Sequence, residues 1–369
     1  MMNRIFVAQP KLAGNERKYV LDCLDTNWIS SIGKYIGAFE EKFASFCGVK
    51  HAIATNNGTS ALHLALVALG LKPGDEVIIP TVTYIATANA IHYCGAKPVL
   101  VDVCPDTMNI DPSKIEEKIT DNTRGIVPVH LYGHPAEMTV INKIADRYGL
   151  WVVEDAAEAH GAEVLGRMVG GLGTCAAFSF FGNKIITTGE GGMVTTNNDK
   201  LAERLKLFRG QGVDLNRHYW FTVVGYNYRM TNIQAAIGLA QMETIDEALF
   251  YRAQIAVWYN DALCGLQDEI ILPTQQFWAK QIYWMYNIFL RDGDEKRRDS
   301  VMHKLDELGI ETRPVFYPIH LLPPYQEDTV YPVADFWAQR GINLPTHQAL
   351  TQSQVFRIAD SLKNVLSKP

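Results

Sequence analysis

The sequence predicts an α/β protein in two parts: a large domain with a mostly parallel sheet over residues 1–245, and a smaller α+β domain over residues 246–369. Short apolar runs rich in Val and Ile alternate with longer amphipathic runs through the first half. This order is typical of parallel strands joined by helices that cover both faces of the sheet. From about residue 200, longer helical segments and one aromatic-rich strand replace the alternation.

The strand-like segments of the first half are bounded by Gly, Pro, Asp or Asn. They are residues 51–57, 76–80, 97–103, 124–130 and 150–156. The segments between them have helical patterns: residues 59–71, 84–95, 111–119 and 137–149. Ligands of such a sheet bind outside the carboxyl ends of its strands, so functional residues are expected at those positions.

The second half has fewer and longer segments. We expect a basic amphipathic helix at 199–212, one long helix at 231–263, a strand at 281–291, and helices within 298–315 and 352–367. Their mixed order predicts an α+β arrangement for the smaller domain.

Composition restricts the classes of partner. The net charge of −6 and the absence of like-charge runs argue against nucleic acid and anionic membranes as partners. No apolar run approaches the roughly 20 residues of a membrane span, and the first 20 residues lack the apolar core of a signal peptide. We expect a cytoplasmic protein. The six cysteines include no C-x-x-C pair, which argues against a disulfide framework or a thiolate zinc site.

A glycine-containing turn follows the first strand in "NNGTSALH". Gly58 and Thr59 open a helix there, and the free N–H groups and positive dipole end of a helix suit a phosphate group. The alternative interpretation is an ordinary capped helix start. The G-x-G-x-x-G and Walker patterns are both absent.

An acid ends a strongly apolar strand in "VVEDAAEAHG". A carboxylate at Asp155 is shielded from water and needs a cationic or N–H partner, although it could instead cap a following helix. Glu158 and His160 are close enough to suggest a metal site. Their spacing does not match a zinc-protease pattern and no second ligand cluster is present, so we expect no metal.

The segment "FSFFGNKIITTGEGG" brings Lys184 and Ser179 between apolar aromatic residues and three glycines. A solvated loop lysine is the alternative, but a partly desolvated lysine has a lowered pKa and forms Schiff bases with carbonyl compounds. A phosphate cradle, a buried acid and such a lysine together are what pyridoxal phosphate requires.

Asn227 and Arg229 precede a helix in "GYNYRMTN". Arg229 could bind a carboxylate or phosphate through two hydrogen bonds. A surface salt bridge is the alternative interpretation.

Five segments together resemble the DegT/DnrJ/EryC1/StrS-type pyridoxal-phosphate-dependent aminotransferases of nucleotide sugars: "NGTSALHLAL", "GDEVIIPTVTYIATANAI", "VEDAAEAHG", "FSFFGNKIITTGEGGMVTTN" and "GYNYRMTNIQAAIGLAQ". The resemblance extends from near the N-terminus to "GINLP" near residue 345. It implies the fold-type I, aspartate aminotransferase-like architecture, with a mixed, mostly parallel sheet in the large domain.

The resemblance also implies roles for individual residues. Lys184 matches the Schiff-base lysine and acid–base group, and Asp155 matches the partner of the cofactor's pyridine nitrogen. The other cofactor contacts that it implies are Gly58, Thr59 and Ser179 at the phosphate, Tyr84 on the ring face, Glu158 near the 3-hydroxyl group, and Asn227 from a neighbouring subunit. Tyr84 could equally be core packing. Candidates for the sugar or its diphosphate are Arg229, Arg313, Tyr317 and His320, with structural hydrogen bonding as the alternative.

The reaction implied is transfer of an amino group from L-glutamate to a GDP-linked 4-keto-6-deoxysugar for O-antigen polysaccharide biosynthesis, by a homodimer with shared active sites or a higher oligomer. UDP- or dTDP-linked sugars and amination at C3 stay open, because pocket shape sets these choices. A sugar dehydratase of the same fold would have His in place of Lys184. An idle regulatory relative is a further alternative, against which Lys184 and Asp155 argue.

Overall fold

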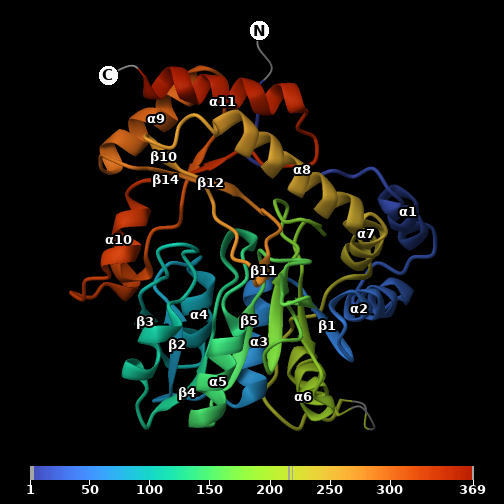
Figure 1. Cartoon of the computed structure of the whole chain (residues 1–369). Helices are drawn as coiled ribbons and strands as arrows, with labels where there is room; N and C mark the ends of the chain where they lie inside the picture. The colour runs from blue at the N-terminus through green and yellow to red at the C-terminus, as the bar shows by residue number, and fades with distance from the viewer. Residues whose placement is uncertain (1–3, 215–216, 218, 368–369) are drawn as a thin grey trace.

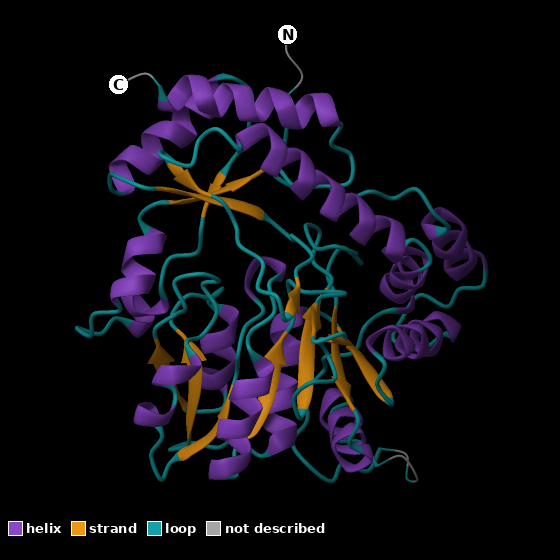
Figure 2. Ribbon diagram, in the orientation of Figure 1, coloured by secondary structure: helices purple, strands orange, loops and turns teal. Residues whose placement is uncertain are grey.

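A seven-stranded sheet forms the centre of the larger part of the molecule (Figures 1 and 2). The structure is a computed structural model that describes residues 4–214, 217 and 219–367. The strands, in the order in which they lie side by side, are β1 (His51–Thr55), β9 (Gly192–Thr196), β8 (Cys175–Ser179), β5 (Trp151–Asp155), β4 (Thr123–Ile126), β2 (Glu76–Pro80) and β3 (Lys97–Val101). Among these described strands β9 runs antiparallel to both of its neighbours, β1 and β8, whereas all the other neighbouring pairs are parallel. The sheet is therefore mixed and mostly parallel, as the family resemblance implied.

Both faces of this sheet are covered, and β2 shows the alternation directly. Val77 and Ile79 belong to one hydrophobic core and Ile78, between them, belongs to another. Successive side chains of a strand point to opposite faces, so each face of the sheet has its own core. The first core packs under α3 (Gly58–Leu69) and α4 (Ala86–Tyr93), and the second packs under α5 (Met138–Tyr148).

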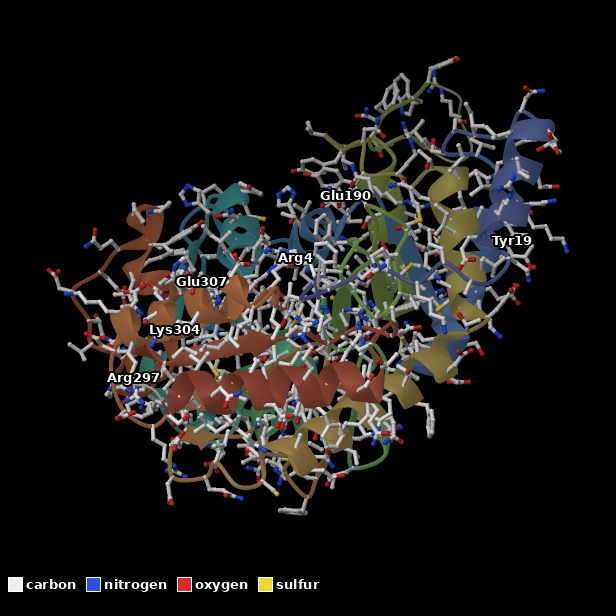
Figure 3. All side chains as sticks on the ribbon, turned by 90° about the horizontal axis from the view of Figure 1, so that it is seen from above. Arg4, Tyr19, Glu190, Arg297, Lys304 and Glu307 are labelled. Carbon is white, nitrogen blue, oxygen red and sulfur yellow. The ribbon has the colours of Figure 1, made fainter. Side chains whose placement is uncertain are left out.

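Further helices lie around the β1 end of the sheet. They are α1 (Glu16–Asp25), α2 (Lys34–Cys47), α6 (Asp199–Arg209) and α7 (Asn232–Met242). Helix α7 packs against both α1 and α2. Seen from above, Tyr19 of α1 marks one end of the molecule and Arg297 marks the opposite end (Figure 3).

The C-terminal residues form a second layer above the large sheet (Figure 1). A four-stranded sheet has the order β10 (Ile270–Ile271), β12 (Tyr286–Leu290), β14 (Gly341–Leu344) and β13 (Arg313–Pro314). The helices around it are α8 (Ile245–Leu263), α9 (Glu295–Glu307), α10 (Pro332–Ala338) and α11 (Gln352–Leu366). Ile5 joins the core between this sheet and its helices, and its N–H donates to the Gly309 carbonyl (2.8 Å). A domain boundary near residue 245 stays a prediction.

A three-stranded sheet lies between the two layers and contains residues from both. Its order is β11 (Ala279–Lys280), β6 (Glu163–Val164) and β7 (Arg167–Met168).

The single helix predicted at 231–263 is wrong, because α7 ends at Met242 and α8 begins at Ile245. Thr244 between them has the non-helical dihedrals φ −120° and ψ 12°. The apolar pattern is continuous through the break, since Met242 and Ile245 are both buried. Helix α7 packs on α1 and α2 whereas α8 packs on α11, and this difference in partners redirects the chain.

The nine-residue helix predicted at 111–119 is also wrong. The chain instead forms two 3₁₀ turns, Pro112–Lys114 and Glu116–Lys118. Asp111 accepts the Ser113 N–H (3.0 Å), and the backbone is extended again at Ile119. So short a segment gains too little packing to stabilise an α-helix.

The strand predicted at 281–291 is shorter than expected, with β12 restricted to Tyr286–Leu290. The residues before it form a loop that pairs with another loop. The N–H groups of Ile282 and Trp284 donate to the carbonyls of Gly133 (3.1 Å) and Tyr132 (3.0 Å). This pairing fixes where the Trp284 side chain lies.

Within the described ranges 4–214 and 219–367, no helix has both the length and the apolar character needed to span a membrane.

Candidate active site

A cavity of about 620 Å³ opens where the carboxyl ends of β2, β5 and β8 meet the second layer. The large domain supplies most of its lining. Trp284, Phe316 and Asn343 reach it from the C-terminal layer. Eight of the residues singled out from the sequence line it: Gly58, Thr59, Tyr84, Asp155, Glu158, Ser179, Lys184 and Arg313.

Lys184 lies in the loop between β8 and β9, with 10% of its side chain exposed. Its Nζ lies 3.7 Å from Glu158 Oε1 and 3.9 Å from the centroid of the Trp284 ring. Burial lowers the pKa of the Lys184 amine, and the carboxylates of Glu158 and Asp155 oppose that shift. A lowered pKa leaves more of the amine in its neutral, nucleophilic form.

The two carboxylate oxygens of Glu158 have different partners, since Oε1 faces the Lys184 amine and Oε2 faces the backbone of Tyr132. Its Oε2 accepts the Tyr132 N–H (2.8 Å), and Tyr132 adopts a left-handed backbone with φ 52°. Burial raises the pKa of Glu158 to about 7, against the opposing effects of the Lys184 charge and the Tyr132 N–H. Near neutral pH this carboxyl group therefore exchanges a proton readily.

Asp155 ends β5 with its carboxylate in the cavity. Thr87 Oγ1 donates to Asp155 Oδ2 (2.7 Å), and the Ala157 N–H donates to Oδ1 (3.2 Å). Burial raises the pKa of Asp155, whereas these two hydrogen bonds and the Lys184 charge lower it. A buried carboxylate with fixed orientation suits a cationic ring nitrogen.

The start of α3 forms a cradle at another part of the cavity. Asn57 Oδ1 accepts the Ser60 N–H (2.7 Å), while the N–H groups of Gly58 and Thr59 make no hydrogen bond within the described chain. A Cβ added at Gly58 would lie 2.7 Å from the Ser179 Cβ, so the close approach of these two segments requires glycine. Free N–H groups at a helix start beside a serine hydroxyl fit the phosphate of pyridoxal phosphate.

Tyr84, just after β2, is 58% exposed and faces the cavity. Its ring lies 5.7 Å from that of Phe316, measured between centroids, at an angle of 53°. The exposed face of Tyr84 is free to stack on a flat ligand.

Several predicted residues do not line this chain's cavity. Asn227 is exposed and pairs with Gly210 in a short bridge. Arg229 pairs with Thr55, and it is Tyr228 between them that reaches the cavity.

Tyr317 and His320 are bonded elsewhere. The Tyr317 hydroxyl donates to Glu295 (2.9 Å). His320 is buried between Thr81 (2.7 Å) and Asp335 (3.0 Å). Of the four sugar candidates only Arg313 lines the cavity, with its Nη2 3.3 Å from Glu311.

Three residues of this site were not predicted from the sequence: Tyr132 and Trp284, which line the cavity, and Thr87, which donates to Asp155. Tyr132 follows the strand region at 124–130, so the rule that ligands bind at strand ends could have found it. Thr87 lies in "TYIATAN", one turn after Tyr84. No sequence pattern near Trp284 indicates its role, because Trp284 is about a hundred residues from Lys184 and contacts it only in the folded chain.

Comparison with known proteins gives a family match over nearly the whole chain. The model of the DegT/DnrJ/EryC1/StrS aminotransferase family matches residues 10–363. The GDP-perosamine synthase of Caulobacter vibrioides is 55% identical over 365 residues, which cover 98% of each chain. That of Escherichia coli O157:H7 is 48% identical over 99% of this chain and 100% of its own. Among solved structures, Helicobacter pylori PseC, an aminotransferase involved in the biosynthesis of pseudoaminic acid, has a TM-score of 0.94 at 28% identity and complete coverage of both chains.

Proposed function

Since the chain belongs to the DegT/DnrJ/EryC1/StrS aminotransferase family, we propose that it transfers the amino group of L-glutamate to GDP-4-dehydro-6-deoxy-D-mannose and so forms GDP-perosamine. The cofactor is pyridoxal phosphate. One observation carries the chemistry: Lys184, Gly58 and the pair Asp155 and Glu158 line a single cavity although they come from three separate segments. The names of the two relatives support the choice of sugar and nucleotide.

We assign the cofactor's phosphate to the N–H groups of Gly58 and Thr59 and to the Ser179 hydroxyl. Asp155 would hold the proton on the pyridine nitrogen, and Tyr84 would cover one face of the ring. When bound, the cofactor supplies an electron sink for the amino-bearing carbon. Glu158, next to the lysine, would face the side of the ring that carries the 3-hydroxyl group.

Lys184 is assigned two tasks. Its Nζ would hold the cofactor covalently at rest and, once released, would move a proton to and from the substrate carbon. The 3.7 Å separation from Glu158 and the lowered pKa of the lysine both favour this exchange. Arg313, at the rim with 49% of its side chain exposed, is the residue that we assign to an anionic part of either substrate.

We further propose a homodimer in which Asn227 contacts the cofactor phosphate of the partner subunit. Its exposure in the single chain supports this assignment. Large apolar side chains are also exposed, which is typical of a surface that another chain covers: Trp28, Ile29, Ile32, Trp220 and Phe221. Analytical ultracentrifugation of the purified protein would test the oligomeric state, and a fully active monomer would contradict the proposed homodimer.

The substrate assignment is tested by incubating the protein with pyridoxal phosphate, L-glutamate and a panel of GDP-, UDP- and dTDP-linked 4-ketosugars. We expect 2-oxoglutarate to form with the GDP sugar. Turnover of a UDP sugar without turnover of the GDP sugar would contradict the substrate but keep the reaction class. A Lys184→Ala variant should lose the visible absorbance of covalently held cofactor. Retention of that absorbance would contradict the proposed role of Lys184.

A further inference from the structure

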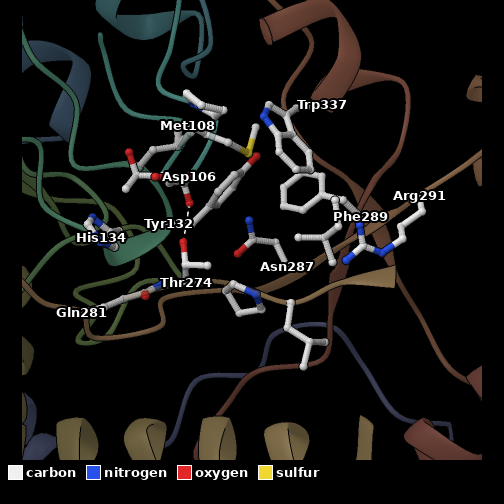
Figure 4. A pocket seen from close by; sticks show the side chains of 16 residues that line it. Asp106, Met108, Tyr132, His134, Thr274, Gln281, Asn287, Phe289, Arg291 and Trp337 are labelled. Atoms are coloured by element: carbon white, nitrogen blue, oxygen red, sulfur yellow. Dashed lines mark hydrogen bonds between the residues drawn. The ribbon is translucent and has the colours of Figure 1, made fainter. Parts of the chain in front are cut away.

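A second cavity of about 300 Å³ lies beside Tyr132 (Figure 4), and Lys184 is not among the residues that line it. It is enclosed by the loop 105–108, by the loop 131–134 and by β10 and β12 of the C-terminal layer. Tyr132 is the one residue that lines both cavities among the described residues. Nothing in the proposed transamination uses this space, although its volume lies within the range of pockets that bind small molecules.

Two buried carboxamides face this second cavity without hydrogen-bond partners. Gln281 and Asn287 are each 7% exposed, and Gln281 Oε1 has no partner in the described chain. No hydrogen bond of the Asn287 amide is formed with the described residues either. Figure 4 shows both amide ends directed toward the space beside Tyr132. Leaving the buried Gln281 oxygen unpaired costs free energy, and a ligand that donates a hydrogen bond to it would recover that cost.

The rest of the lining adds one cation and a set of apolar walls. The guanidinium of Arg291 points inward from the rim (Figure 4), and only its Nε is bonded, to the Gln267 carbonyl, within the described ranges. Tyr132, Phe289 and Trp337 form aromatic walls, with the last two rings in edge contact at 4.3 Å between centroids.

This combination defines the chemistry of a ligand. Arg291 favours an anionic oxygen group, above all a phosphate, which it binds through two N–H groups. Carboxamides both donate and accept hydrogen bonds, so they match hydroxyl groups, which do the same. Aromatic walls suit the C–H faces of a sugar ring. We propose that the second cavity binds a phosphorylated hexose, with the phosphate at Arg291 and the hydroxyl groups at Gln281 and Asn287.

Titration calorimetry on the full chain loaded with pyridoxal phosphate tests this proposal. The probes are D-glucose 6-phosphate and D-mannose 6-phosphate, compared with D-glucose and with inorganic phosphate. We expect at least one hexose phosphate to bind, and the sugar and the phosphate alone to bind about tenfold more weakly or worse. No binding of either hexose phosphate, or equal binding of inorganic phosphate, would overturn the proposal.

Matched variants locate the binding. Arg291→Gln should weaken it about tenfold. The control Arg297→Gln, on the outer surface (Figure 3), should leave it unchanged. Arg313→Gln, in the other cavity, should also leave it unchanged. Loss of binding in Arg313→Gln but not in Arg291→Gln would assign the ligand to the active site and overturn the proposal.

Gln281→Met separates a binding role from a structural one. It keeps the length of the side chain and removes the unpaired amide, so the thermal midpoint should rise while hexose phosphate binding weakens about tenfold. A lower midpoint with unchanged binding would mean that Gln281 serves the fold, and it would overturn the assignment. Because this readout does not involve transamination, its failure is distinguishable from a failure of the proposed function.

Discussion

The Nζ of Lys184 lies 3.9 Å from the centre of the Trp284 ring, although the two residues come from different layers of the molecule. The indole Nε1 donates to the carbonyl of Asn183, the neighbour of Lys184 (2.8 Å). The indole also stacks on Tyr132, at 6.1 Å between centroids and 11° between planes. The C-terminal layer thus fixes both the loop that carries the lysine and the resting place of its amine.

Replacing Trp284 should change the basicity of that amine. A desolvated cation over an aromatic face gains about 2 kcal/mol, which corresponds to roughly one and a half pKa units. Trp284→Leu should therefore lower the pKa of Lys184 further, whereas Trp284→Phe should preserve most of the effect. The pH dependence of the rate at which pyridoxal phosphate combines with the cofactor-free protein measures this pKa. Identical profiles for the two variants would contradict the role of the ring.

Glu158 should impose a pH dependence on stability. Its pKa is raised from 4.5 to about 7 in the folded chain. The folded state therefore binds more protons than the unfolded state between these values. The stability that this group contributes is present in full below pH 4.5 and is lost as the pH rises through 7. We expect urea unfolding of the wild type to show this loss and the Glu158→Gln variant to lack it. Equal pH slopes in both proteins would argue against the shift.

Removing the charge of Asp155 should impair the chemical step. Asp155→Asn cannot hold the proton of a pyridinium nitrogen, and losing one such electrostatic contact costs on the order of a hundredfold in kcat. Thr87→Val removes only the hydrogen bond at 2.7 Å and should have a smaller effect. Single-turnover rates with L-glutamate alone measure both. If Thr87→Val were the more damaging change, Asp155 would not be the group that acts on the ring.

Gly58→Ala should weaken cofactor binding, because the new Cβ would lie 2.7 Å from the Ser179 Cβ and displace one wall of the cradle that we propose for the cofactor phosphate. Gly37→Ala in α2 is a matched control, since nothing lies within 4 Å of a Cβ there. The control should instead stabilise the protein by about 0.5–1 kcal/mol, the usual gain of Ala over Gly inside a helix. Absorbance titration with pyridoxal phosphate and thermal unfolding measure the two effects. An unchanged affinity of Gly58→Ala for pyridoxal phosphate would mean that the cofactor phosphate binds elsewhere.

Much of the lining of the candidate site could be predicted because these residues lie at strand ends. An apolar strand followed by Asp155, a strand followed by Gly58, and an aromatic segment before Lys184 are local patterns. Parallel strands bring their carboxyl ends to one edge, so local patterns at strand ends predict residues that meet in space. Arg313 was also predicted and lines the cavity, but Tyr317 and His320 do not, since nothing local distinguishes a hydrogen bond within the fold from one to a ligand.

The amino-acid sequence by itself determined the class of fold, the strand-end chemistry and the cofactor, because periodicity and residue type act over a few neighbouring residues. Only the tertiary structure decided the break between α7 and α8, the reversed direction of β9 and the position of Trp284 over Lys184. It also decided the existence of the second cavity beside Tyr132. These features depend on packing between segments that are mostly far apart in the sequence, where the free energy comes from buried surfaces that no local pattern records.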